Sequence, residues 1–248
     1  MSLQKLNQIK VLLDDAYEQH KAGNFSVALI GYYKILELDP RHFETLQLIG
    51  FLAYENGKYS DSIDFLTLAL QVQPQDAKVF NSRGLAQQKN GNFISAHHDF
   101  SQAIRLNNNY YEAFNNRGNL YLSSMKYLDA LRDFDAAISI FPDYIDAWCN
   151  KGVTLQKLSK LEDAKNCYQK AIMINPKFAI AHSNLGTLYR DLERYDMACN
   201  HLEIALNIDA RYVDAHYNLG MVFHLGRVMP HKAIQCYQKA LEIQTVSY

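Results

Sequence analysis

The amino-acid sequence predicts an all-α protein, a solenoid of seven helix-turn-helix repeats, and three observations indicate this fold class. Six of the eleven glycines are spaced by 34 residues without exception: Gly50, Gly84, Gly118, Gly152, Gly186 and Gly220. Four prolines lie one or two such periods apart: Pro40, Pro74, Pro142 and Pro176. Apolar residues recur twice per period at the spacing of one helix face. A fixed period of about 20–50 residues is typical of a solenoid.

The repeats follow one another over most of the chain and are predicted to form one domain, residues 1–248. Counting seven residues back from each glycine gives these units: 9–42, 43–76, 77–110, 111–144, 145–178, 179–212 and 213–247. Apolar residues at positions 4, 8 and 11 of a unit predict its first helix, and those at positions 20, 24 and 27 predict its second. A glycine inside a helix costs about 1 kcal/mol. We therefore expect the glycine at position 8 to allow close approach of the two helices.

Start and stop signals delimit the helices of each repeat in turn. The first helix is expected to end at Gly23, Gly57 and Gly91 in repeats 1 to 3, and a proline at position 32 stops the second helix. Repeat 1 has Ala16 in place of the glycine at position 8 and is expected to be an N-terminal cap. Repeats 3 and 6 lack the proline, and repeat 7 carries one extra residue around Gly226–Pro230.

Composition and charge exclude several classes of protein. The 248 residues include 25 Lys and Arg against 26 Asp and Glu, a balance that argues against a nucleic acid or an anionic membrane as partner. No apolar stretch approaches the roughly 18 residues of a membrane span, and no signal-peptide pattern is present. The four cysteines lack metal-ligand spacing, so a reducing, cytoplasmic location is expected.

The repeat pattern resembles the tetratricopeptide repeat, a helix-turn-helix unit of 34 residues. In repeat 5 the resemblance is carried by Trp148, Gly152, Leu155, Ala164, Tyr168, Ala171 and Pro176. It covers residues 9–247 and implies a right-handed superhelix in which the first helices line a concave groove. It also implies a protein or peptide partner held in that groove.

Positions 2, 6, 9 and 13 of each first helix lie opposite its packed face and are expected to line the groove. Position 6 carries an asparagine in four successive repeats: Asn116, Asn150, Asn184 and Asn218. A carboxamide has both donors and an acceptor, so this ladder can hydrogen-bond the backbone of an extended peptide. The ladder resembles the groove of O-linked N-acetylglucosamine transferases. An alternative remains open, in which each asparagine bonds only a neighbouring repeat.

The other groove positions divide into an apolar end and a polar end. Repeats 2 and 3 offer Leu48, Phe51, Tyr54 and Leu85, together with Lys78 and Lys89. Repeats 4 to 6 offer polar candidates that include Asn115, Asn119 and Arg190. We therefore predict a peptide with one apolar or aromatic anchor followed by backbone-bound chain. In the alternative, the apolar residues of repeat 2 pack against the N-terminal helix that carries Leu3 and Leu6.

Catalytic and metal-binding interpretations find no support in the sequence. No phosphate-binding loop, nucleophile elbow or dinucleotide motif occurs, so the chain is predicted not to be an enzyme and to use no cofactor or metal. The run His97-His98-Asp99 lacks a third ligand at helical spacing, and its histidines are expected at the surface.

Several polar residues at packed positions are expected to be structural. His182 and His216 occupy position 4, the place of Trp148, and are predicted to be packed side chains. Arg83 and Arg117, at position 7, are expected to lay their aliphatic stems along the packed side. Binding of a chaperone's C-terminal carboxylate is not expected, because no three consecutive repeats supply the lysine, asparagine and arginine set that it needs.

The second helix of repeat 7 has no capping helix after it in this sequence. Ile234, Tyr237 and Leu241 are therefore predicted to be uncovered and to meet a further domain, a neighbouring molecule or a second copy of the chain in a homodimer.

The leading functional prediction is a non-catalytic scaffold that binds an extended segment of a partner protein in its groove. One alternative is the substrate-recruiting arm of a larger enzyme, because the first two repeats resemble the repeat arm of bacterial O-linked N-acetylglucosamine-transferase-like proteins. The other alternative is a self-associating structural adaptor.

Overall fold

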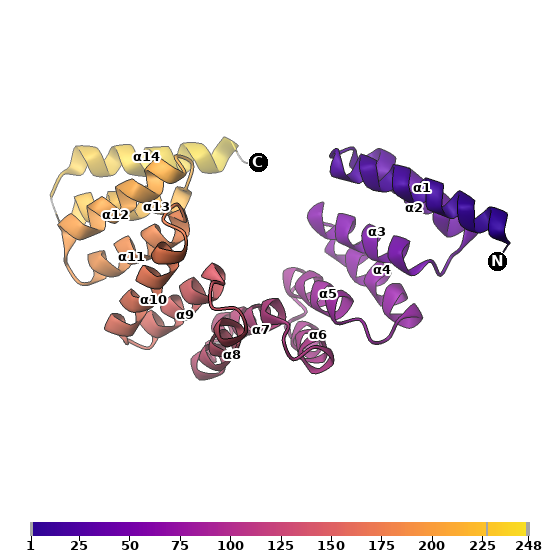
Figure 1. The fold of residues 1–248 in the computed structure, drawn as a ribbon. Helices are drawn as coiled ribbons and strands as arrows, with labels where there is room; N and C mark the ends of the chain where they lie inside the picture. Colours follow the sequence, from indigo (N-terminus) through magenta and orange to yellow (C-terminus); the bar gives the residue numbers. More distant parts are fainter. Residues whose placement is uncertain (1, 227, 247–248) are drawn as a thin grey trace. The chain divides into compact units, whose positions relative to one another are not determined.

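The computed structural model describes residues 2–226 and 228–246, the side chain of Val246 excepted. Within these residues the regular structure is fourteen helices and no strands, and the helices pair into seven hairpins (Figure 1). The first helices of the hairpins, or A-helices, are α1 (Leu3–Lys21), α3 (Phe43–Glu55), α5 (Ala77–Lys89), α7 (Tyr111–Ser123), α9 (Ile145–Lys157), α11 (Ala179–Asp191) and α13 (Val213–Leu225). The second helices, or B-helices, are α2 (Phe25–Leu38), α4 (Tyr59–Val72), α6 (Phe93–Leu106), α8 (Tyr127–Ile140), α10 (Leu161–Ile174), α12 (Tyr195–Ile208) and α14 (Pro230–Val246). The predicted all-α fold of seven helix-turn-helix repeats is confirmed.

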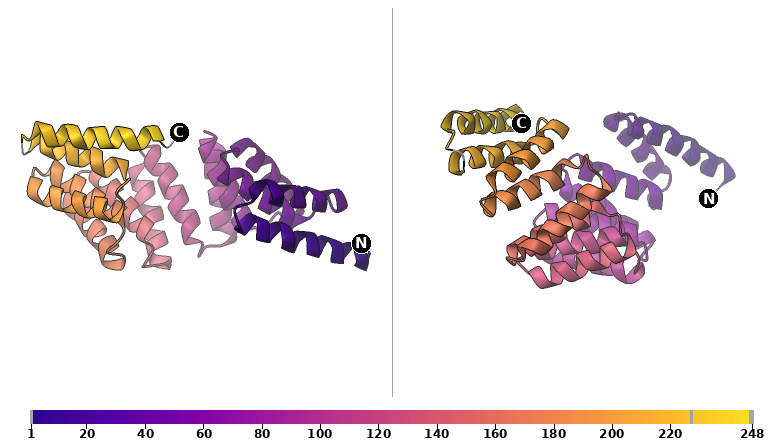
Figure 2. Two further views of the ribbon diagram at one scale, coloured as in Figure 1. Left: turned by 90° about the horizontal axis from the view of Figure 1, so that it is seen from above. Right: turned by 60° about the vertical axis from the view of Figure 1, so that its left-hand side comes forward.

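The chain forms two compact units, one up to Leu120 and one from Tyr121 onward, so the boundary lies within α7. In the second unit the helices from α9 to α14 stack in successive layers, which Figures 1 and 2 show from three sides. None of the helices formed by residues 2–226 and 228–246 is long and apolar enough to cross a membrane.

The glycine at position 8 allows the two helices of a hairpin to approach closely. A Cβ atom added at Gly152 would lie 2.5 Å from the ring of Tyr168, the residue at position 24 of the same repeat. The same contact would be 2.7 Å between Gly84 and Phe100. In repeat 1 the small residue has changed sides, because Ala16 stands at position 8 and its Cβ contacts Gly31 of α2. Close approach, the expected reason for the glycines, is confirmed.

In each repeat, the turn between the two helices contains one residue with a left-handed backbone conformation, that is, a positive φ. Repeats 1 to 3 use Gly23, Gly57 and Gly91, as predicted, with φ between 72° and 82°. Later repeats place other residues there: Met125, Ser159 and Glu193 have φ of 57–58°, and Val228 has φ of 48°. Val228 follows Glu193 by 35 residues instead of 34, which agrees with the predicted extra residue in repeat 7; Arg227 itself lies outside the described residues.

Two local features occur where the B-helices end, and either one is sufficient. One is the proline at position 32, and the other is an aspartate or asparagine at position 31 whose side chain accepts a hydrogen bond from the N–H two residues later. Repeats 3 and 6, which lack the proline, have this turn at Asn107 and Asp209, with N···O distances of 3.0 and 2.9 Å. Repeats 2 and 4, with Gln73 and Phe141 at position 31, have the proline. Absence of the proline therefore does not disturb the repeat.

A ring N–H at position 4 forms a hydrogen bond with a backbone carbonyl at the end of the preceding repeat. The Trp148 Nε1 donates to the carbonyl of Pro142 at 2.8 Å. The Nε2 atoms of His182 and His216 lie 3.1 and 3.0 Å from the carbonyls of Pro176 and Ala210. Because a carbonyl only accepts, both histidines carry a proton on Nε2. The prediction of a packed structural side chain is confirmed for His182, which is 6% exposed, whereas His216 makes the same bond but is only half-buried.

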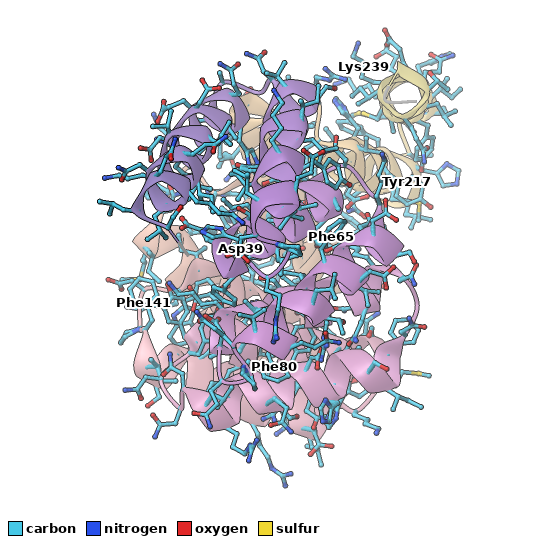
Figure 3. The ribbon with its side chains drawn as sticks, turned by 90° about the vertical axis from the view of Figure 1, so that its right-hand side faces the viewer. Asp39, Phe65, Phe80, Phe141, Tyr217 and Lys239 are labelled. Carbon is cyan, nitrogen blue, oxygen red and sulfur yellow. The ribbon has the colours of Figure 1, made fainter. Side chains whose placement is uncertain are left out.

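Cations at position 7 join neighbouring B-helices. Arg83 binds both carboxylate oxygens of Asp99 on α6 at 2.7 and 2.8 Å and donates to Thr67 on α4 at 3.0 Å. Its guanidinium also lies over the ring of Phe80, which is labelled in Figure 3, 5.6 Å from the ring centroid. Beyond the expected packing of its stem, Arg83 therefore makes ion-pair and hydrogen-bond contacts that the sequence did not predict. Asp99 is 1% exposed, so the His97-His98-Asp99 run has a buried structural carboxylate next to the exposed His98.

One and two repeats later, the cation at position 7 also bonds the preceding B-helix. The Arg117 Nη1 donates to Ser101 of the preceding B-helix at 3.1 Å. The Lys151 Nζ lies 2.6 Å from Asp135 of the preceding B-helix and 5.5 Å from the ring of Trp148. In repeats 3, 4 and 5, the cation at position 7 thus links its A-helix to the preceding repeat.

Candidate peptide-binding face

The A-helices present the surface that the sequence assigned to ligand binding, and in the first unit this surface contains an open pocket. The pocket has a volume of about 220 Å³ and is lined by Phe51, Tyr54, Glu55, Leu66, Ser82 and Leu85. Phe51, Tyr54 and Leu85 were predicted from the sequence, whereas Glu55, Leu66 and Ser82 were not among the candidates for an apolar anchor. The pocket lies between successive A-helices, α3 and α5, with α4 beneath them.

Leu48 has a different environment from its predicted groove neighbours. It packs against a core cluster to which α1, α2 and α3 all contribute, so its side chain is partly buried rather than part of the pocket lining. Leu3 and Leu6 belong to α1, but both side chains are exposed. They do not cover the pocket residues Phe51 and Tyr54, since neither leucine is in the pocket lining.

The asparagine ladder is tied to neighbouring repeats at the two members whose bonds are described. In the first unit, the Asn116 Nδ2 donates to the Oδ1 of Asn81 at 3.0 Å. Asn81 is buried at position 5 of the preceding repeat. Sequence reasoning missed Asn81, although Asn81 and Asn115 repeat at the 34-residue spacing and mark position 5 as polar.

In the second unit, Asn218 accepts a hydrogen bond from the Arg190 Nη1 at 2.6 Å. Arg190 also binds Asp191, whose other carboxylate oxygen accepts from the Nε2 of Gln156 at 2.8 Å. The Oε1 of Gln156 accepts from the hydroxyl of Tyr168 at 3.1 Å. A continuous series of hydrogen-bonded side chains therefore runs across repeats 5, 6 and 7. It lies on the surface formed by the A-helices, which we call the A-helix face.

The remaining groove candidates differ in how much of their side chain reaches the surface. Asn150, Asn184 and Asn119 are half-buried on their A-helices, and Lys78 and Lys89 are exposed at the two ends of α5. Asn115 is only 4% exposed, so it contributes little surface for a ligand.

The cysteines are free thiols with structural surroundings. Burial raises the pKa of Cys149 to about 12 and that of Cys167 to about 11. Thiolates, the nucleophilic form, are therefore disfavoured at both residues near neutral pH. Among residues 2–226 and 228–246 there is also no group of three or more His, Cys, Asp or Glu side chains placed to hold a metal ion.

Comparison with known families identifies the class of protein. Three family models, each described as a tetratricopeptide repeat, match residues 81–145, 145–178 and 177–245. Together these matches span about two thirds of the chain, and the chain belongs to the tetratricopeptide repeat family. No curated protein sequence matches it significantly.

Solved structures agree with this assignment at the level of fold. A tetratricopeptide repeat protein from Parabacteroides merdae has a TM-score of 0.81 at 17% identity, covering 96% of this chain and 93% of its own. The hetero-tetramer Cut9–Hcn1 of the APC/C matches with a TM-score of 0.77 at 20% identity, over 92% of this chain and 45% of that one. YrrB, described as a tetratricopeptide repeat protein with an unusual peptide-binding site, has a TM-score of 0.53 at 22% identity, over 73% of this chain and 92% of its own.

Proposed function

We propose that this protein is a non-catalytic scaffold that binds an extended segment of a partner protein along its A-helix face. The observation that carries the proposal is the open pocket of repeats 2 and 3, which lies on the same face as Asn116. An apolar pocket supplies affinity through a buried anchor side chain, and amides supply hydrogen bonds to an extended backbone. YrrB, which is similar in fold, is described as having a peptide-binding site.

The bonds to neighbouring repeats leave hydrogen-bonding capacity on the asparagines. A carboxamide has two N–H donors and one carbonyl oxygen with two lone pairs. Asn116 uses one donor on Asn81, and Asn218 uses an acceptor site on Arg190. The inter-repeat bonds fix the orientation of these two amides, which reduces the entropy lost when they bind a peptide.

A test of this function should alter the A-helix face without removing an inter-repeat bond. Ser82 and Asn184 are suitable, because both are half-buried on A-helices and neither side chain has a hydrogen-bond partner among the described residues. We expect peptides selected from a random phage-displayed library on the wild-type chain to bind at least tenfold more weakly to Ser82→Arg/Asn184→Arg, as measured by fluorescence anisotropy.

The matched control carries the same charges on the B-helix face, at the exposed residues Ile94 and Met173. The variant Ile94→Arg/Met173→Arg should bind the selected peptides as the wild type does. Failure to select any peptide, or equal weakening in both variants, would contradict binding on the A-helix face.

Self-association is a second candidate function, and exposed apolar residues of α14 favour it. Ile234 is 51% exposed and Leu241 is 61% exposed. Tyr237, in contrast, packs its ring against Gly220 of its own hairpin and lies 5.7 Å from the Tyr217 ring, so it is only partly uncovered. Leu241→Glu is therefore the suitable variant, and light scattering should show a dimer only for the wild type. A monomeric wild type would rule out this candidate.

The interpretation as the arm of a larger enzyme is a prediction from the sequence resemblance alone. None of the similar structures reported above is described as a glycosyltransferase.

A further inference from the structure

The pocket on the A-helix face lies where other repeats place a tyrosine side chain. In repeats 1 and 5, position 24 is a tyrosine. The Tyr32 hydroxyl lies 3.1 Å from the Nδ1 of His20, and the Tyr168 hydroxyl donates to the Oε1 of Gln156 at 3.1 Å. His20 and Gln156 both occupy position 12 of their repeats. The phenol ring therefore extends from the hairpin interior toward position 12.

Repeat 2 has a shorter residue at position 24. Leu66 packs against Gly50 as Tyr168 packs against Gly152, but its side chain ends where the outer half of a phenol ring begins. Position 12 of repeat 2 is Tyr54. Leu66 and Tyr54 both line the open pocket, so it lies between the same two positions that a phenol ring joins in repeats 1 and 5.

The size and lining of this pocket suit an aromatic ring. Its volume is about 220 Å³. An apolar cavity of about 150 Å³ is known to accept benzene. Phe51 and Tyr54 contribute aromatic side chains to the lining, and Leu66 and Leu85 contribute aliphatic ones, which are favourable surroundings for an aromatic side chain.

Two polar groups of the pocket, a carboxylate and a hydroxyl, can each accept a hydrogen bond from a ring that carries a donor. Glu55 contributes a carboxylate that is 56% exposed, and Ser82 contributes a hydroxyl from α5. The Nε2 of His20 lies 3.4 Å from this carboxylate, which helps to hold it in place. A carboxylate accepts a hydrogen bond from a phenol hydroxyl and repels an anion such as a phosphate ester.

We propose that the pocket formed by Phe51, Tyr54, Glu55, Leu66, Ser82 and Leu85 binds a tyrosine side chain of the partner segment. The ring lies over Leu66 in the space that a phenol fills in repeats 1 and 5, and its hydroxyl donates to Glu55 or Ser82. Phosphorylation of that tyrosine prevents binding. This inference rests on the proposed function and names the residue that the scaffold recognises.

The test uses N-acetyl-tyrosinamide, N-acetyl-phenylalaninamide and N-acetyl-phosphotyrosinamide as probes on the full chain with labelled leucine methyl groups. We expect the tyrosine probe to shift the NMR signals of Leu66 and Leu85. The phenylalanine probe should bind several-fold more weakly, because it lacks the hydroxyl. The phosphotyrosine probe should bind at least tenfold more weakly than the tyrosine probe.

Matched variants separate the pocket from general effects on the fold. Leu66→Phe fills the pocket from inside, as Phe100 does at position 24 of repeat 3, and should abolish the shift of Leu85. Leu202→Phe makes the same change at position 24 of repeat 6 and should leave binding intact. Glu55→Gln removes the charge at the surface, keeps the fold, and should let the phosphotyrosine probe bind better.

Three results would overturn the inference: no shift with the tyrosine probe, equal binding of the phosphotyrosine probe, or unchanged binding to Leu66→Phe. Its failure differs from failure of the proposed function. If library-selected peptides still bind the wild type and lose affinity for Ser82→Arg/Asn184→Arg, the A-helix face binds peptides without a tyrosine anchor.

Discussion

Backbone conformation at single residues varies between repeats that otherwise pack alike. Gly23, Gly57 and Gly91 hold a left-handed turn, and Ser159 and Glu193 hold the same turn with φ of 58° and 57°. A left-handed backbone costs a residue with a Cβ atom roughly 1–2 kcal/mol. The later repeats therefore bear a strain that the early repeats lack.

Replacing these residues by glycine should stabilise the protein. Ser159→Gly and Glu193→Gly each remove the strain but add freedom to the unfolded chain, so the net gain should be about 0.5–1 kcal/mol. The measurement is the free energy of unfolding from urea titration. Ser159→Ala should give no gain, since alanine keeps the Cβ atom. A loss of stability in both glycine variants would show that the turn is not strained.

At the scale of the helix pair, repeat 1 also has closely packed helices, but its glycine lies on the second helix instead of the first. Ala16 stands where other repeats have glycine, and Gly31 takes the contact on α2. A Cβ atom added at Gly31 would lie 2.7 Å from the Cβ of Ala16. The departure that the sequence marked as a terminal cap is therefore an exchange of the small residue between two helices.

This exchange predicts a compensating pair of substitutions. Gly31→Ala should destabilise the protein by about 1–3 kcal/mol through overpacking. Adding Ala16→Gly should recover a large part of that loss, because the second change removes the opposing methyl group. Urea titrations of the two single variants and the double variant measure the coupling. Strictly additive effects would mean that the two helices do not constrain each other here.

Another contact between paired helices predicts a dependence on pH. Burial, with a smaller contribution from nearby His182, lowers the pKa of His201 below its usual value of 6.5. The two Nδ1 atoms lie 3.2 Å apart, and the His201 ring stacks on Tyr189. Since His182 donates through Nε2 to Pro176, its neutral form accepts the Nδ1 proton of His201. The folded state thus favours neutral His201.

Because the unfolded chain binds the proton more readily, stability should fall as pH decreases through about 6.5. His201→Phe keeps a ring against Tyr189 but cannot titrate. We expect melting temperatures measured from pH 7.5 to pH 5.5 to fall less for His201→Phe than for the wild type. Parallel curves for the two proteins would mean that His201 titrates equally in both states.

The positions of the helices could be predicted from the sequence more completely than the side-chain contacts between them. The 34-residue period predicts where both helices of each repeat lie, because the small residue at position 8 and the large residue at position 24 recur with it and pack against each other. The burial of Asp99 could not be predicted, since it depends on an ion pair with Arg83 of the paired helix, sixteen residues earlier in the chain. For the pocket, the rim residues Phe51, Tyr54 and Leu85 were predicted, whereas Leu66 at its base was not, because a leucine at position 24 is typical of an ordinary core residue.

At the scale of the whole molecule, the division into two compact units had no signal in the sequence. The 34-residue period continues unchanged through α7, where the boundary lies. Repeats in a solenoid interact mainly with their nearest neighbours, so stability is approximately a sum of local contributions. A local defect should therefore stay within its own unit.

Asp99→Ala tests this locality. It leaves the Arg83 guanidinium, 15% exposed, without its carboxylate and should destabilise the first unit by about 3 kcal/mol. Hydrogen exchange followed by mass spectrometry should accelerate in α5 and α6 and remain slow from α9 to α14. Asp135→Ala, which removes a mostly exposed carboxylate from Lys151, serves as the control with little effect. Acceleration throughout the chain would indicate a single cooperative unit.

The hydrogen bond from a position-4 ring to the preceding repeat has a consequence for protein engineering. A cassette cut at the 34-residue frame, such as 145–178, would leave the Trp148 indole without the Pro142 carbonyl that it binds. A cassette of the same length that runs from 141 to 174 keeps the turn, the proline and the indole together. Modules exchanged between solenoids should therefore be joined just before position 31, where each transplanted segment brings its own closure.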